Sequence, residues 1–480
     1  MKKYLILFTS LLLGLASCSS DDSNEPATEP QPEVEAKGVE LYLTIRSGTQ
    51  RLTKQTNINF SNDIANLTIR LDSTDLKQEI EGFGGSLTGS SAYLIKNMSE
   101  AARAKLLSDL FTESGIALKY LRLAIGSSDF SMGDYTYCDE NGINNFAIPA
   151  VDKRDLLPVL KEILALNKNI KLMSTPWTAP AWMKKNKNLY GGSLIGESVY
   201  NDFSEYFIKY IQAYKNEGIN IDAISLQNEP RHEIGSYPTM YMEWDEQNKI
   251  IRDYLGPKLK QAGIATKILI WDHNFDGYDY PTKILNDSKT REYIGGAAFH
   301  GYGGSPNDLD NLLRTHPDVP LYFTEQSGGG WNTDDAIGNM LYYMKEMLMP
   351  TINKGSRNFL MWNIALDSGN GPVTTTGGGC QDCRGVVTIK DNNTYSVNEE
   401  YYLLGHFSKF IKEGARRINH TVVGTKPSNM QICSFLNPDG SKVVVVLNQT
   451  GANQQFTVRT GDRRFTYSLF DQSVASFIYK

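Results

Sequence analysis

Eight short apolar runs recur along the middle of the chain, and each ends in glycine, aromatic or polar residues. Runs of this length, bounded in this way, are typical of strands buried on both faces of a parallel sheet. Consecutive parallel strands also need long crossover connections. The runs are Glu79–Gly85, Tyr120–Gly126, Ile170–Trp177, Ala223–Pro230, Lys267–Asn274, Gly296–Tyr302, Leu321–Gln326 and Asn358–Leu366.

Helical patterns fill most of the segments between these runs. One helix follows the N-cap candidate Ser99 and would bury a stripe of large apolar residues, Leu106, Leu107, Leu110 and Phe111. Further helices are predicted over Asp155–Leu166, Val199–Asn216, Thr239–Ala262 and Asp335–Asn353. Eight strand and helix units in about 290 residues predict an α/β fold of the (β/α)8 TIM-barrel type.

The two ends of the ordered chain show a different pattern, in which apolar and polar residues alternate. Alternation over Val39–Leu71 predicts half-buried antiparallel strands, and Asn437-Pro438-Asp439-Gly440 predicts a hairpin turn near the C-terminus. Neither end is large enough to bury a sheet face alone, so we expect both to combine into one β-sandwich. The predicted divisions are residues 39–75 and 395–480 for the sandwich and 76–394 for the barrel.

The N-terminus has the layout of an export signal. Two lysines precede the apolar run Tyr4–Ala16, which is too short to span a bilayer, and Cys18 follows directly. Residues 1–18 resemble a lipoprotein signal peptide whose lipobox ends in Cys18, although an ordinary cleaved signal is the alternative. Residues 19–38 are rich in Ser, Asp, Glu and Pro and predict a disordered tether. We therefore expect an exported lipoprotein, lipidated at Cys18 and held at the outer membrane on the cell surface.

Charge and cysteine usage exclude several classes of function. The formal net charge of −6, with lysine and arginine spread throughout, leaves no basic face for nucleic acid. Cys380 and Cys383 form a Cys-x-x-Cys without a second pair at zinc-ribbon spacing, so we expect a local disulfide rather than a metal site. Motifs for nucleotides, dinucleotides and catalytic zinc are absent from the sequence, and we expect a monomer that needs no metal or cofactor.

Two glutamates carry the candidate chemistry. Glu229 ends the fourth run and Glu325 ends the seventh. In a barrel the carboxyl ends of all strands meet at one mouth, so these carboxylates are expected to face each other there. Such a pair can cleave a glycosidic bond, with one carboxyl as acid/base and the other as nucleophile. The acid of such a pair is kept protonated by desolvation and by the negative charge of its partner.

Several blocks, in this order along the chain, resemble glycoside hydrolase family thirty, which belongs to a clan of retaining barrel hydrolases. The resemblance extends from about Leu41 to the end of the chain. The blocks are Glu81-Gly82-Phe83-Gly84-Gly85, Leu121-Arg122-Leu123, Ser128-Asp129-Phe130-Ser131, Ser174-Thr175-Pro176-Trp177, Asn228-Glu229-Pro230, Phe323-Thr324-Glu325 and Trp362-Asn363-Ile364-Ala365-Leu366.

This resemblance implies roles for individual residues. Glu229 would be the acid/base, Glu325 the nucleophile, and Trp362 the platform on which a sugar ring stacks. Gly89 departs from the family pattern, which has an acidic residue there. The resemblance also assigns substrate-binding positions, to which we add weaker candidates from the mouth loops. Together they are Arg122, Asp129, Trp177, Asn228, His300, Tyr302 and Trp362, and then Tyr237, Trp331, His273, Asp272 and Asn274.

The glycine-rich segment Gly377–Val387 resembles the β-1,6-glucanase branch of the family. The implied function is an endo-β-1,6-glucanase that depolymerises fungal-type β-1,6-glucan. Two alternatives remain open at this point. One is an exo-acting β-glucosidase or glucosylceramidase, and the other is a surface glycan-binding lipoprotein without catalysis.

Overall fold

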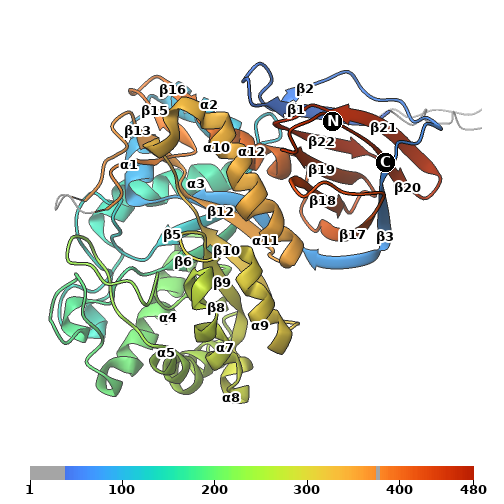
Figure 1. Cartoon of the computed structure of the whole chain (residues 1–480). Coiled ribbons are helices and arrows are strands. Elements are labelled where there is room, and N and C mark those ends of the chain that lie inside the picture. Colours follow the sequence, from blue (N-terminus) through green and yellow to red (C-terminus); the bar gives the residue numbers. More distant parts are fainter. Residues whose placement is uncertain (1–37, 375–378) are drawn as a thin grey trace, which may run out of the picture. The chain divides into compact units, whose positions relative to one another are not determined.

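The computed structural model describes residues 38–374 and 379–480, and the expected signal peptide, tether and Cys18 lie outside these ranges. Eight parallel strands form the central sheet (Figure 1). They are β4 (Gly82–Ser86), β5 (Tyr120–Ala124), β6 (Lys171–Thr175), β7 (Ala223–Ser225), β8 (Lys267–Asn274), β9 (Ile294–His300), β10 (Leu321–Glu325) and β12 (Asn358–Asn363). Each of the eight predicted runs overlaps one of these strands.

The sheet closes into a barrel. Its hydrogen-bonded order runs from β10 through β9, β8, β7, β6, β5 and β4 to β12. A parallel bridge between Leu321 and Ser356 joins the two outer strands, and the Asn358 side chain accepts the Phe323 N–H at 2.8 Å. A buried layer inside the barrel contains Tyr120, Met173, Ala223, Leu269, Ala298, Tyr322 and Leu360, one residue from each of seven strands. The predicted (β/α)8 barrel is confirmed.

Helices cover the outside of the barrel, largely where the sequence predicts them. α2 (Glu100–Phe111) buries all four predicted apolar residues, although the Ser99 side chain makes no capping hydrogen bond. α4 (Tyr200–Asn216) buries its whole aromatic stripe against the barrel. The remaining helices are α1 (Gly89–Lys96), α3 (Leu157–Leu166), α5 (Trp244–Ile250), α6 (Gly256–Gln261), α7 (Asp279–Leu285), α8 (Ser288–Arg291), α9 (Leu309–Thr315), α10 (Ala336–Tyr343), α11 (Met349–Lys354) and α12 (Glu399–Ser408).

Three π-helical turns interrupt these helices, and each lies just before a proline. Asp152–Leu156 precedes Pro158, Ile251–Leu255 precedes Pro257, and Met344–Leu348 precedes Pro350. Proline lacks an N–H and its ring clashes with the carbonyl four residues earlier, so the chain widens by one residue there instead of breaking. The predicted helix over Thr239–Ala262 begins only at Trp244, where the Glu243 carboxylate caps it.

The N- and C-terminal strands combine into one nine-stranded sheet, ordered β2-β1-β22-β19-β18-β17-β3-β20-β21. Its apolar residues form a separate core between the sheet faces. The predicted β-sandwich is thus confirmed. The strands are β1 (Glu40–Ile45), β2 (Thr53–Lys54), β3 (Leu67–Glu79), β17 (Arg416–Val423), β18 (Met430–Leu436), β19 (Lys442–Asn448), β20 (Gln454–Thr460), β21 (Arg463–Leu469) and β22 (Ser473–Tyr479).

Sandwich and barrel share buried residues. His406 of α12 bonds Thr44 of β1 and Ser476 of β22, both at 2.8 Å. Phe435 and Val445 of the sandwich belong to the same continuous core as the barrel helices. Among the described residues, no helix is both long and apolar enough to cross a lipid bilayer.

Candidate active site

The polar residues that end the barrel strands surround one open pocket of about 500 Å³. Eleven of the fourteen candidate catalytic and binding residues line it, namely Glu229, Glu325, Asp129, Trp177, Asn228, Tyr302, Trp362, Tyr237, Trp331, His273 and Asn274. Arg122, His300 and Asp272 do not line the pocket. All three are fully buried beneath it, where Arg122 contacts Glu325 and His300 contacts Glu229.

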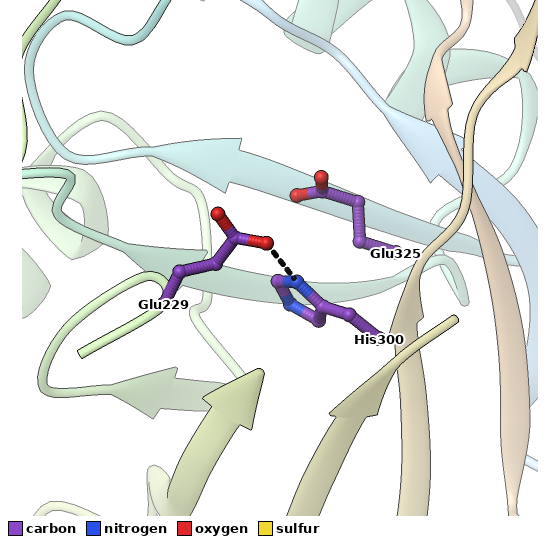
Figure 2. A group of neighbouring side chains, drawn as sticks. All are labelled: Glu229, His300 and Glu325. Carbon is purple, nitrogen blue, oxygen red and sulfur yellow. Dashed lines mark hydrogen bonds and ion pairs between the residues drawn. The ribbon is translucent and has the colours of Figure 1, made fainter. Parts of the chain in front are cut away.

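Glu229 and Glu325 approach each other across this pocket (Figure 2). Glu325 is the last residue of β10, and Glu229 lies four residues beyond the end of β7. A carboxylate oxygen of each residue and a ring nitrogen of His300 all lie within 4.8 Å of one another. Carboxylates about 5 Å apart are typical of retaining glycosidases, whereas inverting enzymes separate them by about 6.5–9.5 Å to admit a water.

The backbone is strained where it presents these groups. Glu229 has a φ of 49°, and Trp271 and Asp272 on the neighbouring strand have φ values of 76° and 64°. The left-handed region is costly for residues other than glycine and persists only where the surroundings enforce it. Here the Glu229 N–H donates to the Asp272 carbonyl at 3.0 Å, so the two strained segments hold each other.

Arg122 and Tyr302 hold the Glu325 carboxylate. Arg122 Nη1 donates to Oε2 at 2.5 Å, and the Tyr302 hydroxyl donates to Oε1 at 3.0 Å. Burial raises the pKa of Glu325, and the positive charges of His300 and Arg122 oppose that rise. Arg122 and Tyr302 thus both bond the Glu325 carboxylate. Because Arg122 already places a cation on Glu325, the cluster of Glu229, His300 and Glu325 is poorly suited to a metal ion.

Asp272 ties the site together from below, a role that the sequence did not indicate. Its carboxylate accepts hydrogen bonds from Arg122 at 2.9 Å, from Ser225 at 2.6 Å and from Thr324 at 2.6 Å, and it bonds His300 at 3.0 Å. Burial disfavours its charge, but the Arg122 guanidinium and these bonds hold the pKa of Asp272 well below its usual range. One buried carboxylate therefore orients both Arg122 and His300.

His300 lies between two carboxylates, with Nδ1 3.1 Å from Glu229 and Nε2 3.0 Å from Asp272. Burial opposes a charge on this ring, but the negative charges of Glu325, Asp272 and Glu229 outweigh it and raise the pKa of His300 to about 9. Burial alone would raise the pKa of Glu229. The His300 hydrogen bond and the charges of the nearby histidines outweigh burial and lower this pKa to about 2. The lowered pKa of Glu229 runs against the expectation that its own carboxyl holds the proton, and His300 is the neighbouring group whose pKa is raised.

Both parts of the chain match known domains. Residues 80–411 match the glycosyl hydrolase family 30 TIM-barrel domain, and residues 414–477 match the family's β-sandwich domain. The chain belongs to glycosyl hydrolase family 30. The matched barrel extends past the expected boundary at 394 because α12 packs against strand β4 of the barrel.

Relatives of the chain include enzymes with different substrates. An endo-1,6-β-D-glucanase of Trichoderma harzianum is 33% identical over 469 residues, covering 92% of each chain. The lysosomal acid glucosylceramidase of Mus musculus is 28% identical over 488 residues, covering 95% of this chain and 91% of its own. A solved endo-β1,6-glucanase superimposes with a TM-score of 0.86 and 38% identity, covering 92% of this chain and 99% of its own.

The aromatic wall of this family 30 pocket differs from expectation in one respect. Trp362, the expected sugar platform, is stacked on Trp177 with ring centroids 5.1 Å apart, and Phe130 meets it edge-on at 6.2 Å. These contacts cover most of Trp362, which is only 3% exposed. Tyr302 and Trp331 also line the pocket and are 45% and 52% exposed, so they offer stacking surface beyond Trp362.

Cys380 and Cys383 form the predicted disulfide, and both line the pocket. Their oxidation confirms the local disulfide over a zinc site. Adjacent Gly379 lies against Asp129, where an added Cβ would come within 2.9 Å of the Asp129 Cβ. Cys138 and Cys433, which have no role from the sequence, are buried free thiols. Gly377 and Gly378 of the glycine-rich segment lie outside the described residues.

Sequence reasoning missed three pocket residues, His232, Ile234 and Ser327. His232 bonds the Tyr237 hydroxyl at 2.9 Å and so holds that ring against the pocket. The signal for His232 was its position three residues after Glu229, in the same loop. Ile234 carried no signal, because an exposed apolar loop residue is common on protein surfaces.

Proposed function

We propose that this family 30 glycoside hydrolase is a retaining endo-β-1,6-glucanase that depolymerises β-1,6-glucan by double displacement. The observation that carries the mechanism is the approach of the Glu229 and Glu325 carboxylates to within 4.8 Å. Similarity to endo-1,6-β-glucanases over nearly the whole chain supports the substrate. The paired carboxylates argue against the non-catalytic alternative.

In the first step, a Glu325 oxygen attacks the anomeric carbon and the bond to the leaving sugar breaks. Glu229 donates a proton to the departing oxygen, so a glycosyl ester on Glu325 and a free sugar hydroxyl result. In the second step, Glu229 takes a proton from water, the water oxygen attacks the anomeric carbon, and the ester bond to Glu325 breaks. Two inversions leave the product in the β configuration of the substrate.

The proton for the first step is available one hydrogen bond away from Glu229. Substrate covering the pocket desolvates the Glu229 carboxylate further, which favours its neutral form. The proton then moves from His300 Nδ1 to Glu229 Oε1, and the Nε2–H of the neutral ring continues to donate to Asp272. His300 thereby acts as a proton store for the acid.

Asn228 is oriented to serve the sugar hydroxyl next to the reacting carbon. Its Oδ1 accepts from Arg122 Nη2 at 2.6 Å, which directs the amide so that its Nδ2 donors remain for a ligand. Hydrogen bonds to this hydroxyl strengthen in the transition state of glycoside cleavage. Arg122 therefore positions both the nucleophile and Asn228.

Digestion of pustulan, a β-1,6-glucan, tests the proposal. We expect a mixture of gentio-oligosaccharides early in the reaction, together with a β-anomer signal that precedes mutarotation in proton NMR. Release of glucose alone would favour the exo-acting β-glucosidase alternative. An initial α-anomer would overturn the retaining mechanism.

We expect the ionisation of Asp129 to set the pH above which activity falls. Burial, followed by the negative charges of Glu325 and Glu229, raises its pKa to about 8, so below pH 8 this carboxyl is protonated and donates to a sugar hydroxyl. In wild type, kcat/KM should fall as pH rises through about 8. Asp129→Asn keeps a neutral donor, so its alkaline limb should move to about pH 9, where His300 loses its proton.

A pH profile of kcat/KM from pH 5 to 10 measures this shift. Asp462→Asn, which changes an exposed carboxyl in the sandwich, is the control and should keep the wild-type profile. If kcat/KM falls at the same alkaline pH in wild type and in Asp129→Asn, the ionisation of Asp129 does not govern activity. A wild-type limb below pH 7 would contradict the raised pKa.

We also propose that the chain is an exported lipoprotein anchored at the outer membrane through Cys18. The apolar run ahead of Ser17-Cys18 and the polar segment after it support this location. Labelled palmitate should enter the wild-type chain and not Cys18→Ser. Labelling of both forms would rule out Cys18 as the lipidated residue.

A further inference from the structure

A second open cavity, of about 530 Å³, adjoins the active-site pocket at the junction of barrel and sandwich. Trp331 lines both cavities. It lies in the segment that leaves β10 after Glu325 and leads into α10, which carries Asn339 and Tyr342 on the far side of the second cavity. The loop that follows the proposed nucleophile Glu325 therefore joins the two cavities.

Two exposed aromatic rings give this cavity the character of a sugar-binding surface. Trp331 is 52% exposed and Tyr342 is 51% exposed. The Trp331 ring packs on Gly329, where an added Cβ would lie 1.8 Å from the indole, so one face of the ring is supported. The faces of these rings suit the apolar faces of sugar rings.

Polar groups accompany these rings, as hydroxyl recognition requires. Asn339 is 6% exposed, and its Nδ2 has no hydrogen-bond partner among the described residues. Gln449, contributed by the sandwich, likewise has an unpaired Oε1 within the described part of the chain. An unpaired buried amide group is costly, and a ligand that satisfies it recovers that cost. Arg46 of the sandwich pairs with Asp335 of the barrel and fixes the two sides of the cavity.

We propose that this cavity binds glucosyl units of the same polysaccharide chain, beyond those held in the active-site pocket. The proposal rests on the proposed endo-glucanase function. A pocket of about 500 Å³ encloses only a few sugar rings, so a polymer cleaved internally must continue outside it. Trp331 leads the chain from the pocket to Tyr342, Asn339 and Gln449, and the sandwich thereby takes part in substrate binding.

Kinetics of Tyr342→Ala on two substrates test this subsite. On pustulan, KM should rise about fivefold to twentyfold with little change in kcat, because a stacking surface for the ground-state polymer is lost. On the shortest gentio-oligosaccharide that wild type cleaves, kcat/KM should stay at the wild-type value, since that substrate does not reach the cavity. Tyr342→Phe keeps the ring and should behave as wild type on both substrates.

Gln449→Ala provides a second probe from the sandwich side, remote from the catalytic carboxylates. It should weaken action on pustulan and spare the short substrate. If both alanine variants match wild type on pustulan, or lose activity equally on both substrates, the subsite is refuted. If wild type does not cleave pustulan at all, the proposed substrate fails and the subsite fails with it. If wild type cleaves pustulan and both alanine variants match it, only the subsite is refuted and the proposed substrate stands.

Discussion

Glu325→Gln should lower kcat on β-1,6-glucan by about 10⁴-fold to 10⁶-fold, the scale on which removal of a catalytic nucleophile acts. The amide fills the same volume but cannot form the glycosyl ester. Arg122 keeps its bond to Asp272 in this variant, so its buried charge remains paired and the fold should persist. Pustulan turnover measures the loss, and thermal unfolding checks the fold.

Glu325→Ala gives a sharper test of the nucleophile. The truncated side chain leaves space for azide at the position of the lost carboxylate, on the α face of the sugar. Azide should then restore cleavage of an activated aryl β-glycoside and release an α-glycosyl azide, because one displacement inverts the anomeric carbon.

Glu233→Gln changes an exposed carboxylate in a pocket loop and should retain activity within about twofold. Retention of more than about 1% activity by Glu325→Gln would exclude it as the nucleophile.

Glu229→Ala should lower kcat on β-1,6-glucan by about 10²-fold to 10⁴-fold, the usual contribution of general acid and base catalysis. A sugar leaving group needs the proton that Glu229 supplies, whereas an activated phenolate does not. On an activated aryl β-glycoside, the first step should therefore survive and the glycosyl enzyme on Glu325 should accumulate. Rapid-quench kinetics should show a burst of phenol followed by slow turnover.

Azide distinguishes the two glutamates. In Glu229→Ala, azide should accelerate turnover of the intermediate and release a β-glycosyl azide, since it attacks the face from which the leaving group departed. The two alanine variants thus yield azides of opposite configuration. Formation of the α-azide by Glu229→Ala would reverse the assigned roles, and a variant without a burst on the aryl substrate would show that Glu229 does more than transfer protons.

The apolar runs predicted the barrel well because a strand buried on both faces has to be apolar along its length. Each of the eight runs overlaps a barrel strand, and the hairpin at Asn437–Gly440 joins β18 to β19 as predicted. The apolar pattern gives little sign of β17 and β21, because charged and polar residues are frequent in them, as in Arg416-Arg417 and Arg463-Arg464. Strands at a half-exposed sheet carry only a weak apolar signal.

Helix boundaries were less predictable than helix positions. The loop that carries Tyr237 takes up the first part of one predicted helix, so α5 begins only at Trp244. Three helices contain a π-helical turn just before a proline. Local propensity does not reveal such effects, because they depend on what the preceding loop contacts across the pocket.

Sequence alone established the fold class, the two-part organisation and the pair Glu229 and Glu325, because strand periodicity and topology bring the ends of barrel strands to one mouth. Only the folded structure revealed that His300 bonds both Glu229 and Asp272, that Asp272 orients Arg122 and His300, and that Trp177 covers Trp362. These features depend on distances of about 3 Å between residues far apart in the chain. Electrostatic shifts and burial follow from those distances, and residue order does not encode them directly.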